Sequence, residues 1–254
     1  MKSWIYRANE FQKTAGFYKL FKRTVYILYI SLIWIVYGRT IRPFLPETGQ
    51  YVQYNGRAVF PESYGDRFIP WFPDKPNYEE NYVACIQDYI EEGERVVVIG
   101  GGWGVSTVVA AESVGKTGEV IVFEGSEQSV QRVEQTIRLN GVENRVAVNH
   151  TIVGERISLR GNEGGAAIKA PEELPECDVL LIDSDGAELS ILRKIEIRPD
   201  LIIAEHHAVC DESGVAIEYQ PDTMIGLFTQ LGYTVRDQRT KDDHLCYVAM
   251  RSNG

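Results

Sequence analysis

The sequence predicts an α/β fold, in which helices flank a mostly parallel β-sheet. From Asn77 onward, short apolar runs rich in Val and Ile alternate with segments of helical spacing, which is typical of repeated βαβ units. These runs lack polar–apolar alternation, as expected for strands buried on both faces. One of them, residues 95–99, leads directly into four glycines that only Trp103 interrupts. A buried strand, a glycine turn and a helix indicate a nucleotide-binding unit, because the helix N-terminus offers free N–H donors. A tight turn without a ligand is the alternative.

The remaining elements follow from local patterns. Apolar residues three and four apart predict a helix over 78–92, which Gly93 ends. Either Ser126 or Ser129 can cap the helix that follows the second strand. Residues 154–176 are rich in Gly, Glu and Pro and indicate a short hairpin or an exposed loop. In chain order, the expected helices span 78–92, 105–114, 126–139, 187–195 and 221–231, and the expected strands span 95–99, 119–123, 145–153, 178–182, 200–204, 233–239 and 244–251.

Charge and proline content divide the chain. Residues 1–45 hold eight Lys or Arg against one acid, Glu10, a net charge of +7, which leaves −17 for the rest because the whole chain carries −10. An acidic body argues against nucleic-acid binding, which needs clustered cations. Six of the ten prolines fall in residues 43–76, where Asn55-Gly56 indicates a short hairpin. We therefore expect an N-terminal extension and connector over residues 1–76 and a main domain over residues 77–254.

The most apolar run of the chain, Val25 to Tyr37, leaves its environment open. Thirteen residues span only about 20 Å as a helix, less than the roughly 30 Å hydrocarbon core of a membrane. The run is either a helix that packs on the main domain or on a second subunit, or an interfacial membrane segment, with a single spanning helix as the remaining alternative. In the second case the basic residues within 19–42 face anionic head groups. The four cysteines form no CxxC pair and are typical of reduced thiols. We expect a cytoplasmic protein, with membrane contact and homo-oligomerisation as open possibilities.

Polar residues gather where the predicted strands end. Ligands of open parallel sheets bind at the carboxyl ends of the strands, so these residues form the candidate site. Glu124 ends the second strand, twenty residues beyond Gly104, where an acid can accept both hydroxyl protons of a ribose. Enzymes that use NAD and enzymes that use S-adenosylmethionine (SAM) share this device. The strand-end segments are Gly100–Gly104, Glu124, Asn149–Ile152, Asp183–Asp185 and Glu205–His207.

The glycine spacing favours SAM over NAD. A dinucleotide turn follows the pattern GxGxxG or GxGxxA, and its third small residue lets helix and strand pack around a pyrophosphate. Here that third position is Val105 or Thr107, depending on the starting glycine. Gly100, Gly102 and Gly104 instead form a looser pattern suited to a ligand without a pyrophosphate. An NAD-dependent oxidoreductase of Rossmann type remains the alternative enzyme.

The motifs of residues 77–251 resemble those of FkbM-type SAM-dependent methyltransferases. The most specific is Ile182-Asp183-Ser184-Asp185-Gly186-Ala187-Glu188, similar to that family's I-D-x-E-G-A-E block. The other matching segments are Val96–Thr107, Phe123–Glu124, Asp178–Leu192, Pro199–His207 and Leu231–Tyr233. The resemblance implies a Rossmann-like class I methyltransferase sheet of seven strands with the last strand antiparallel. It also implies methyl transfer from SAM, usually to a hydroxyl oxygen. Val98 stands where the family generally has an acid, and Asp185 where it usually has Glu.

Carried onto this chain, the resemblance assigns a role to each candidate residue. Asp183 would lie beside the sulfonium and the acceptor, and Asp183, His206 or His207 could take the acceptor's proton. Capping of the loop by Asp183, and mere orientation of Glu205 by the histidines, are the structural alternatives. The cofactor-binding residues would be Gly100, Gly101, Gly102 and Gly104 at the methionine part, Glu124 and Gly125 at the ribose, Thr151 and Ile152 near the adenine, and Asp183 itself.

The sequence therefore predicts a SAM-dependent methyltransferase that methylates a hydroxyl of a small, sugar-like or lipid-linked acceptor. A non-catalytic, membrane-associated SAM-binding protein is a further alternative, suggested by Val98 and the basic apolar N-terminal segment. A metal site built from Asp183, Glu205, His206 and Cys210 matches no usual ligand spacing, so no metal is expected.

Overall fold

A computed structural model describes residues 36, 40, 51–59, 74–154, 163–184, 186–207, 221–241 and 244–252. The chain divides into two compact units, and nearly all of the described residues belong to the second, Tyr51–Glu62, Phe72–Val209 and Glu218–Gly254. The apolar run Val25–Tyr37 lies outside the described residues except for Val36, so its environment stays a prediction. Within the part of the chain that is described, no helix is both long enough and apolar enough to cross a bilayer.

The second unit is built from alternating strands and helices, as the sequence predicts. Its helices are α2 (Glu80–Tyr89), α3 (Val105–Ser113), α4 (Glu127–Leu139), α5 (Glu188–Leu192) and α6 (Pro221–Gln230). Its strands are β1 (Val52–Tyr54), β2 (Arg57–Val59), β3 (Arg95–Ile99), β4 (Glu119–Glu124), β5 (Val146–Val153), β6 (Ala167–Lys169), β7 (Val179–Ile182), β8 (Leu201–His207), β9 (Tyr233–Lys241) and β10 (His244–Arg251). Short 3₁₀ turns, η4 (Glu143–Arg145) and η5 (Pro171–Glu173), precede β5 and β7.

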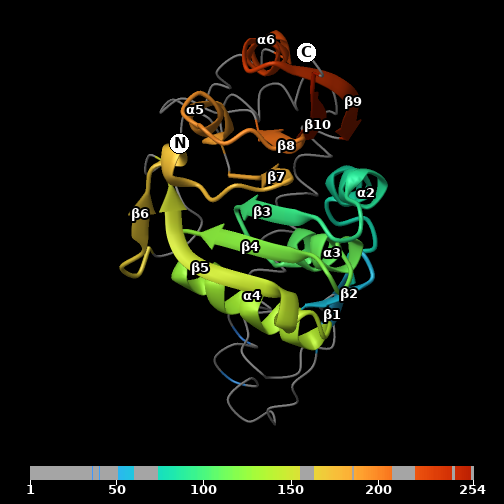
Figure 1. Cartoon of the computed structure of the whole chain (residues 1–254). Coiled ribbons are helices and arrows are strands. Elements are labelled where there is room, and N and C mark those ends of the chain that lie inside the picture. The colour runs from blue at the N-terminus through green and yellow to red at the C-terminus, as the bar shows by residue number, and fades with distance from the viewer. Residues whose placement is uncertain are drawn as a thin grey trace, which may run out of the picture. The chain divides into compact units, whose positions relative to one another are not determined.

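Eight of these strands form one twisted sheet in the order β6-β5-β4-β3-β7-β8-β10-β9 (Figure 1). The strands from β6 to β8 are parallel, whereas β10 pairs antiparallel with both β8 and β9. The chain order reverses beside β3, which has β4 on one side and β7 on the other. In sheets of this kind that reversal opens a crevice at the carboxyl ends of the strands, where ligands bind.

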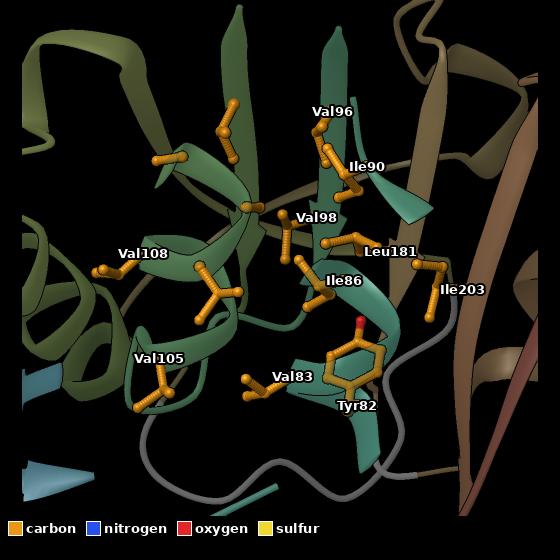
Figure 2. Packing of buried hydrophobic residues seen from close by; sticks show 14 of the residues in the cluster. Tyr82, Val83, Ile86, Ile90, Val96, Val98, Val105, Val108, Leu181 and Ile203 are labelled. Carbon is orange, nitrogen blue, oxygen red and sulfur yellow. The ribbon is translucent and has the colours of Figure 1, made fainter. Parts of the chain in front are cut away.

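Apolar side chains cover both faces of the sheet. One buried cluster joins α2, α3 and α4 to the sheet, and a second joins α5 and α6 to the opposite face. Figure 2 shows the first cluster, in which Tyr82 and Ile86 of α2 lie near Leu181 and Ile203 of the neighbouring strands β7 and β8. This packing fixes α2 against the sheet close to the strand ends.

The connector contains the predicted hairpin. Strands β1 and β2 pair antiparallel, and the two residues between them, Asn55 and Gly56, both have positive φ, as a type I′ turn requires. The Asn140 side chain, just after α4, donates to the Ala58 carbonyl at 2.8 Å and accepts from the Ala58 N–H at 3.1 Å. The hairpin is thereby attached to the end of α4.

Three elements differ from the sequence prediction. Residues 163–170 contain the short strand β6, which pairs parallel with the end of β5 instead of forming a hairpin. The helix expected over 187–195 is regular only over Glu188–Leu192. Strand β8, expected to end at Ala204, continues to His207 because β10 pairs with it as far as the His207–His244 pair.

Candidate active site

The glycine turn after β3 has backbone conformations and contacts that require glycine. Gly100 has φ +91°, and a Cβ placed on it would lie 1.7 Å from the carbonyl oxygen of Asp183. Gly102 also has positive φ, but a Cβ there would meet nothing within 4 Å. Gly100 thus permits contact with the end of β7, whereas Gly102 presents bare backbone to open space. Such an open backbone surface fits a ligand that lies across the turn.

Glu124, at the end of β4, is buried and holds the glycine turn in place. Its Oε2 atom accepts the N–H of Gly101 at 2.8 Å and that of Gly102 at 3.1 Å. Its Oε1 atom accepts the Ser126 N–H at 2.7 Å. Each carboxylate oxygen has two lone-pair directions, and three of the four are occupied, so the Oε1 atom retains capacity for one further donor such as a hydroxyl. Ser126 also caps α4, because its Oγ atom accepts the Ser129 N–H at 3.4 Å. Of the two serines predicted as possible caps, Ser126 is the one that caps the helix.

Asp183 and Glu205 extend from adjacent strands toward the face covered by α2. The β7–β8 register pairs Ile182 with Ala204, so Asp183 and Glu205 follow at equivalent positions. Leu181 and Ile203, two residues before each, both belong to the cluster beneath α2, and side chains two residues apart in a strand share a face. The two acidic residues therefore occupy neighbouring positions on the α2 face of the sheet, with Asp183 on the strand next to β3 and Glu205 one strand further away.

Two tyrosines of the α2 region lie close to these carboxylates. Burial raises the pKa of Tyr82 well above its usual value, and the charges of Asp183 and Glu205 contribute to the rise. Burial also raises the pKa of Tyr78, followed by the charge and hydrogen bond of Glu79 and by the same two carboxylates. A raised pKa keeps each phenol protonated, with Tyr82 fully buried and the Tyr78 hydroxyl hydrogen-bonded to Glu79.

Aromatic rings connect the glycine turn to the hairpin and to α2. The Trp103 ring meets the Tyr54 ring edge to face, with centroids 5.5 Å apart, and the Tyr54 and Tyr78 centroids are 4.9 Å apart. The Arg132 guanidinium lies 4.5 Å from the Trp103 centroid, within the range of a cation–π contact. Trp103 and Tyr78 are each only partly buried, so this row of rings borders the site.

The loop after β7 is held by Glu188, a fully buried residue. Its Oε1 atom accepts the N–H of Ser184 at 3.0 Å, the Ser184 hydroxyl at 3.2 Å and the Gly186 N–H at 3.0 Å. These bonds fix the backbone directly after Asp183. In the sequence, Glu188 ends the block that resembles the family motif, and its position there assigns it no role.

The structure does not place His206 beside Asp183. Residues alternate between the faces of β8, and His206 faces α5, where its Nδ1 atom lies 4.0 Å from Glu188 Oε2. Its side chain is 6% exposed. The backbone of His207 ends β8, and its side chain lies outside the described atoms. The roles of Asp183, His206 and His207 in catalysis stay predictions, and only Asp183 is located next to the glycine turn.

The residues predicted near the adenine lie in the part of β5 that continues past β4. The last β4–β5 pair is Glu124 with His150, and Thr151 and Ile152 follow, paired with β6. Both of these side chains are largely buried. A hydrogen bond holds Gly125 in place, because its carbonyl oxygen lies 3.3 Å from the His150 ring nitrogen Nε2. Contact of these residues with a cofactor stays a prediction.

Val98 belongs to the apolar layer beneath α2 and is fully buried. Figure 2 shows it near Ile86 and Leu181. An acid at this position would lie among apolar side chains, so the valine is the residue that this packing favours. Among the described residues, no group of three or more His, Cys, Asp or Glu side chains could hold a metal ion.

Several residues of the site lack a sequence signal of their own. In the sequence, three aromatic residues look like ordinary apolar positions of a helix and a turn, namely Tyr78, Tyr82 and Trp103. Strand alternation could have separated Glu205 from His206, because neighbouring strand residues face opposite sides. The role of Glu188 depends on a loop geometry that spacing alone does not define.

Comparison with known proteins relates this site to methyltransferases. Residues 76–155, from the start of the α2 region to just past β5, match the family model of protein-L-isoaspartate(D-aspartate) O-methyltransferase. The matched segment includes the glycine turn and Glu124. None of the curated proteins matches the chain.

Solved structures share the fold at low sequence identity. The ribosomal protein L11 methylase of Lactobacillus delbrueckii subsp. bulgaricus is 15% identical, with a TM-score of 0.51 over 79% of this chain and 95% of that one. TYW2 of M. jannaschii, solved in complex with AdoMet (SAM), is 17% identical, with a TM-score of 0.50 over 82% of this chain and 88% of that one. The fold is therefore the Rossmann-like methyltransferase fold, with β6 as an additional edge strand. Together with the family match, it supports SAM-dependent methyl transfer as the class of activity and SAM as the cofactor.

Proposed function

We propose that this chain is a SAM-dependent O-methyltransferase, of the FkbM type that its motifs resemble, acting on a hydroxyl of a small, sugar-like or lipid-linked acceptor. One observation carries the proposal. The backbone of Gly100 touches that of Asp183 so closely that a Cβ would overlap the Asp183 carbonyl, and this backbone contact supports a role for the Asp183 carboxylate beside the turn. A carboxylate at that position can accept a hydroxyl proton next to the methyl donor.

The residues present fit SAM. The open backbone at Gly102 would lie against the methionine part, and the remaining acceptor direction of Glu124 Oε1 would receive a ribose hydroxyl. When bound, SAM supplies an electrophilic methyl group on a sulfonium, which needs no further activation by the protein. Val98 is buried and adds no charge beneath the turn.

The chain's own residues then have two tasks. The first is alignment, because holding the acceptor oxygen in line with the methyl group supplies much of the rate. Trp103 and Tyr78, at the border of the site, would provide a surface on which the acceptor rests. The second is removal of the acceptor's proton by Asp183.

The test combines binding and turnover. Isothermal titration with SAM, its demethylated product and NAD should show binding of the first two, whereas binding of NAD without SAM would overturn the proposal. Transfer of labelled methyl from SAM to fractionated cell extract, followed by base treatment, would identify the acceptor class. Methyl ethers resist base and carboxylate methyl esters do not. A base-labile product would replace the hydroxyl with a carboxyl acceptor.

Asp183→Asn separates catalysis from binding. The amide preserves size but is a poor proton acceptor, so SAM affinity should stay within about threefold while turnover falls by 10² or more. Asp237→Asn, whose carboxylate binds Arg239 on β9, serves as the matched control and should leave turnover unchanged. Full activity of Asp183→Asn would remove the proposed base.

We further propose that the basic segment 19–42, which lies almost wholly outside the described residues, contacts anionic membranes from the cytoplasmic side. The support is its charge and apolar content. Sedimentation with vesicles that contain anionic lipid should carry down the full chain but not a chain lacking residues 1–40. Equal sedimentation of both would refute the membrane contact.

A further inference from the structure

Two cysteines that are 161 residues apart in the sequence meet beneath α2. Cys246 of β10 donates a hydrogen bond to Cys85 of α2, with the two sulfur atoms 3.4 Å apart. Both are free thiols and both are buried, with exposures of 0% for Cys85 and 1% for Cys246. Neither residue belongs to the proposed methyl-transfer machinery, so the pair is a separate feature of the fold.

Strand pairing surrounds the thiols with charged groups. Cys246 lies opposite Glu205 on β8 and opposite Arg239 on β9, so the three side chains form a row that faces α2. Arg239 binds Asp237 at 2.7 Å and Asp88 of α2 at 2.8 Å. Asp88 is three residues beyond Cys85 and therefore lies on the same side of the helix. The thiol pair is thus positioned between the carboxylates of the site and this ion-pair network.

The surroundings make the two thiols unequal. The hydrogen bond from Cys246 lowers the pKa of Cys85, and the positive charge of Arg239 acts in the same direction. Donation of that bond, together with burial, raises the pKa of Cys246. A thiolate is the nucleophilic form of cysteine, so Cys85 is the attacking group and Cys246 the partner that follows.

We propose that Cys85 and Cys246 form a redox-sensitive pair that closes to a disulfide and fastens α2 to β10. With hydrogen peroxide as the oxidant, the Cys85 thiolate attacks one peroxide oxygen, which gives a Cys85 sulfenic acid and hydroxide. Cys246 then attacks the Cys85 sulfur, the S–S bond forms, and the departing oxygen leaves as water with the Cys246 proton. The two sulfurs lose two electrons, which reduce the peroxide. Closure brings the sulfurs to about 2.05 Å.

The pair is tested on the full chain, held well below its unfolding temperature and treated with hydrogen peroxide. Alkylation after denaturation should fall from four thiols to two, and peptide mapping should find Cys85 joined to Cys246, with reversal by dithiothreitol. Retention of both thiols, or a bond to another cysteine, would overturn the proposal. Because these observations use the unaltered chain, they do not depend on a variant that folds.

Two variants and one further measurement sharpen the result. Cys177→Ser should still lose two thiols, whereas Cys246→Ser should lose none to a disulfide and should accumulate a dimedone-reactive Cys85. Amide hydrogen exchange in α2 should slow at least tenfold in the oxidised wild-type chain, because the helix can no longer open independently of β10. Unchanged exchange in α2 would show that the bond does not fasten the helix.

Discussion

Replacement of Glu124 by Gln tests whether one carboxylate both holds the glycine turn and binds the cofactor. In the structure this group accepts three backbone N–H donors, two from the turn (Gly101 and Gly102) and one from Ser126. Gln has a single acceptor oxygen. Its best orientation keeps the two bonds to the turn and directs the amide NH₂ toward the Ser126 N–H, where donor meets donor.

The cost follows from these contacts. Loss of one hydrogen bond to a charged acceptor costs about 1.5–3 kcal/mol, and the two remaining bonds weaken because the acceptor is neutral. We expect the free energy of unfolding to fall by about 2–3 kcal/mol, which leaves most domains folded. A ribose hydroxyl loses a charged acceptor by the same change, so SAM should bind about 10- to 100-fold more weakly.

Urea denaturation measures the first effect and isothermal titration with SAM the second. Glu119→Gln is the matched control, because Glu119 lies on the same strand but is exposed, in an ion pair with Arg95 at 2.8 Å. That change should cost less than about 1 kcal/mol and leave SAM binding unaltered. If Glu124→Gln behaved like the control in both measurements, the reasoning would be wrong. A loss of stability with unchanged affinity would refute only the cofactor role.

Three further predictions rest on individual contacts. Gly100→Ala should lower the free energy of unfolding by more than about 3 kcal/mol in urea denaturation, because positive φ adds about 1–2 kcal/mol of strain and the new Cβ overlaps the Asp183 carbonyl. Gly102→Ala has open space around it and should cost only about 1 kcal/mol of stability. The same Gly102 variant should bind SAM more weakly in titration. Glu188→Ala leaves two loop N–H groups without their acceptor and should cost about 3–5 kcal/mol, whereas Glu188→Gln should recover most of that stability and of the turnover. Burial alone would raise the pKa of Asp237, but the Arg239 guanidinium outweighs burial and lowers that pKa. The ion pair therefore stabilises the folded protein at pH values above the pKa that Asp237 has in the unfolded chain. This stabilisation is lost as the pH falls through the lower pKa of the folded state. Asp237→Asn should therefore cost up to about 1 kcal/mol at pH 7 and nothing near pH 2, as followed by denaturation at each pH.

The elements that the sequence predicts best are those with local causes. The run at residues 95–99, the glycines after it and the helix from Val105 depend on neighbouring residues, and the structure confirms all three. The hairpin at Asn55-Gly56 and the Ser126 cap are equally local. Each depends on φ preferences or on a hydrogen bond that spans three residues or fewer.

The elements that the sequence does not predict depend on pairing between distant segments. Strand β6 is too short to recognise, and it forms because β5 continues past β4 and offers an unpaired edge. Strand β8 extends to His207 because β10, which begins only at His244, pairs with it. That extension places Glu205 and His206 on opposite faces and so divides a cluster that looks continuous in the sequence.

The sequence by itself determined the fold class, the glycine turn, the position of Glu124 and the presence of Asp183 at a strand end. The tertiary structure alone decided that Gly100 touches Asp183, that Glu188 holds the following loop, and that Cys85 meets Cys246. The physical reason is the range of the interactions. Backbone preferences and apolar periodicity act over a few residues, whereas strand order and the packing of α2 bring together side chains that nothing in their local sequence connects.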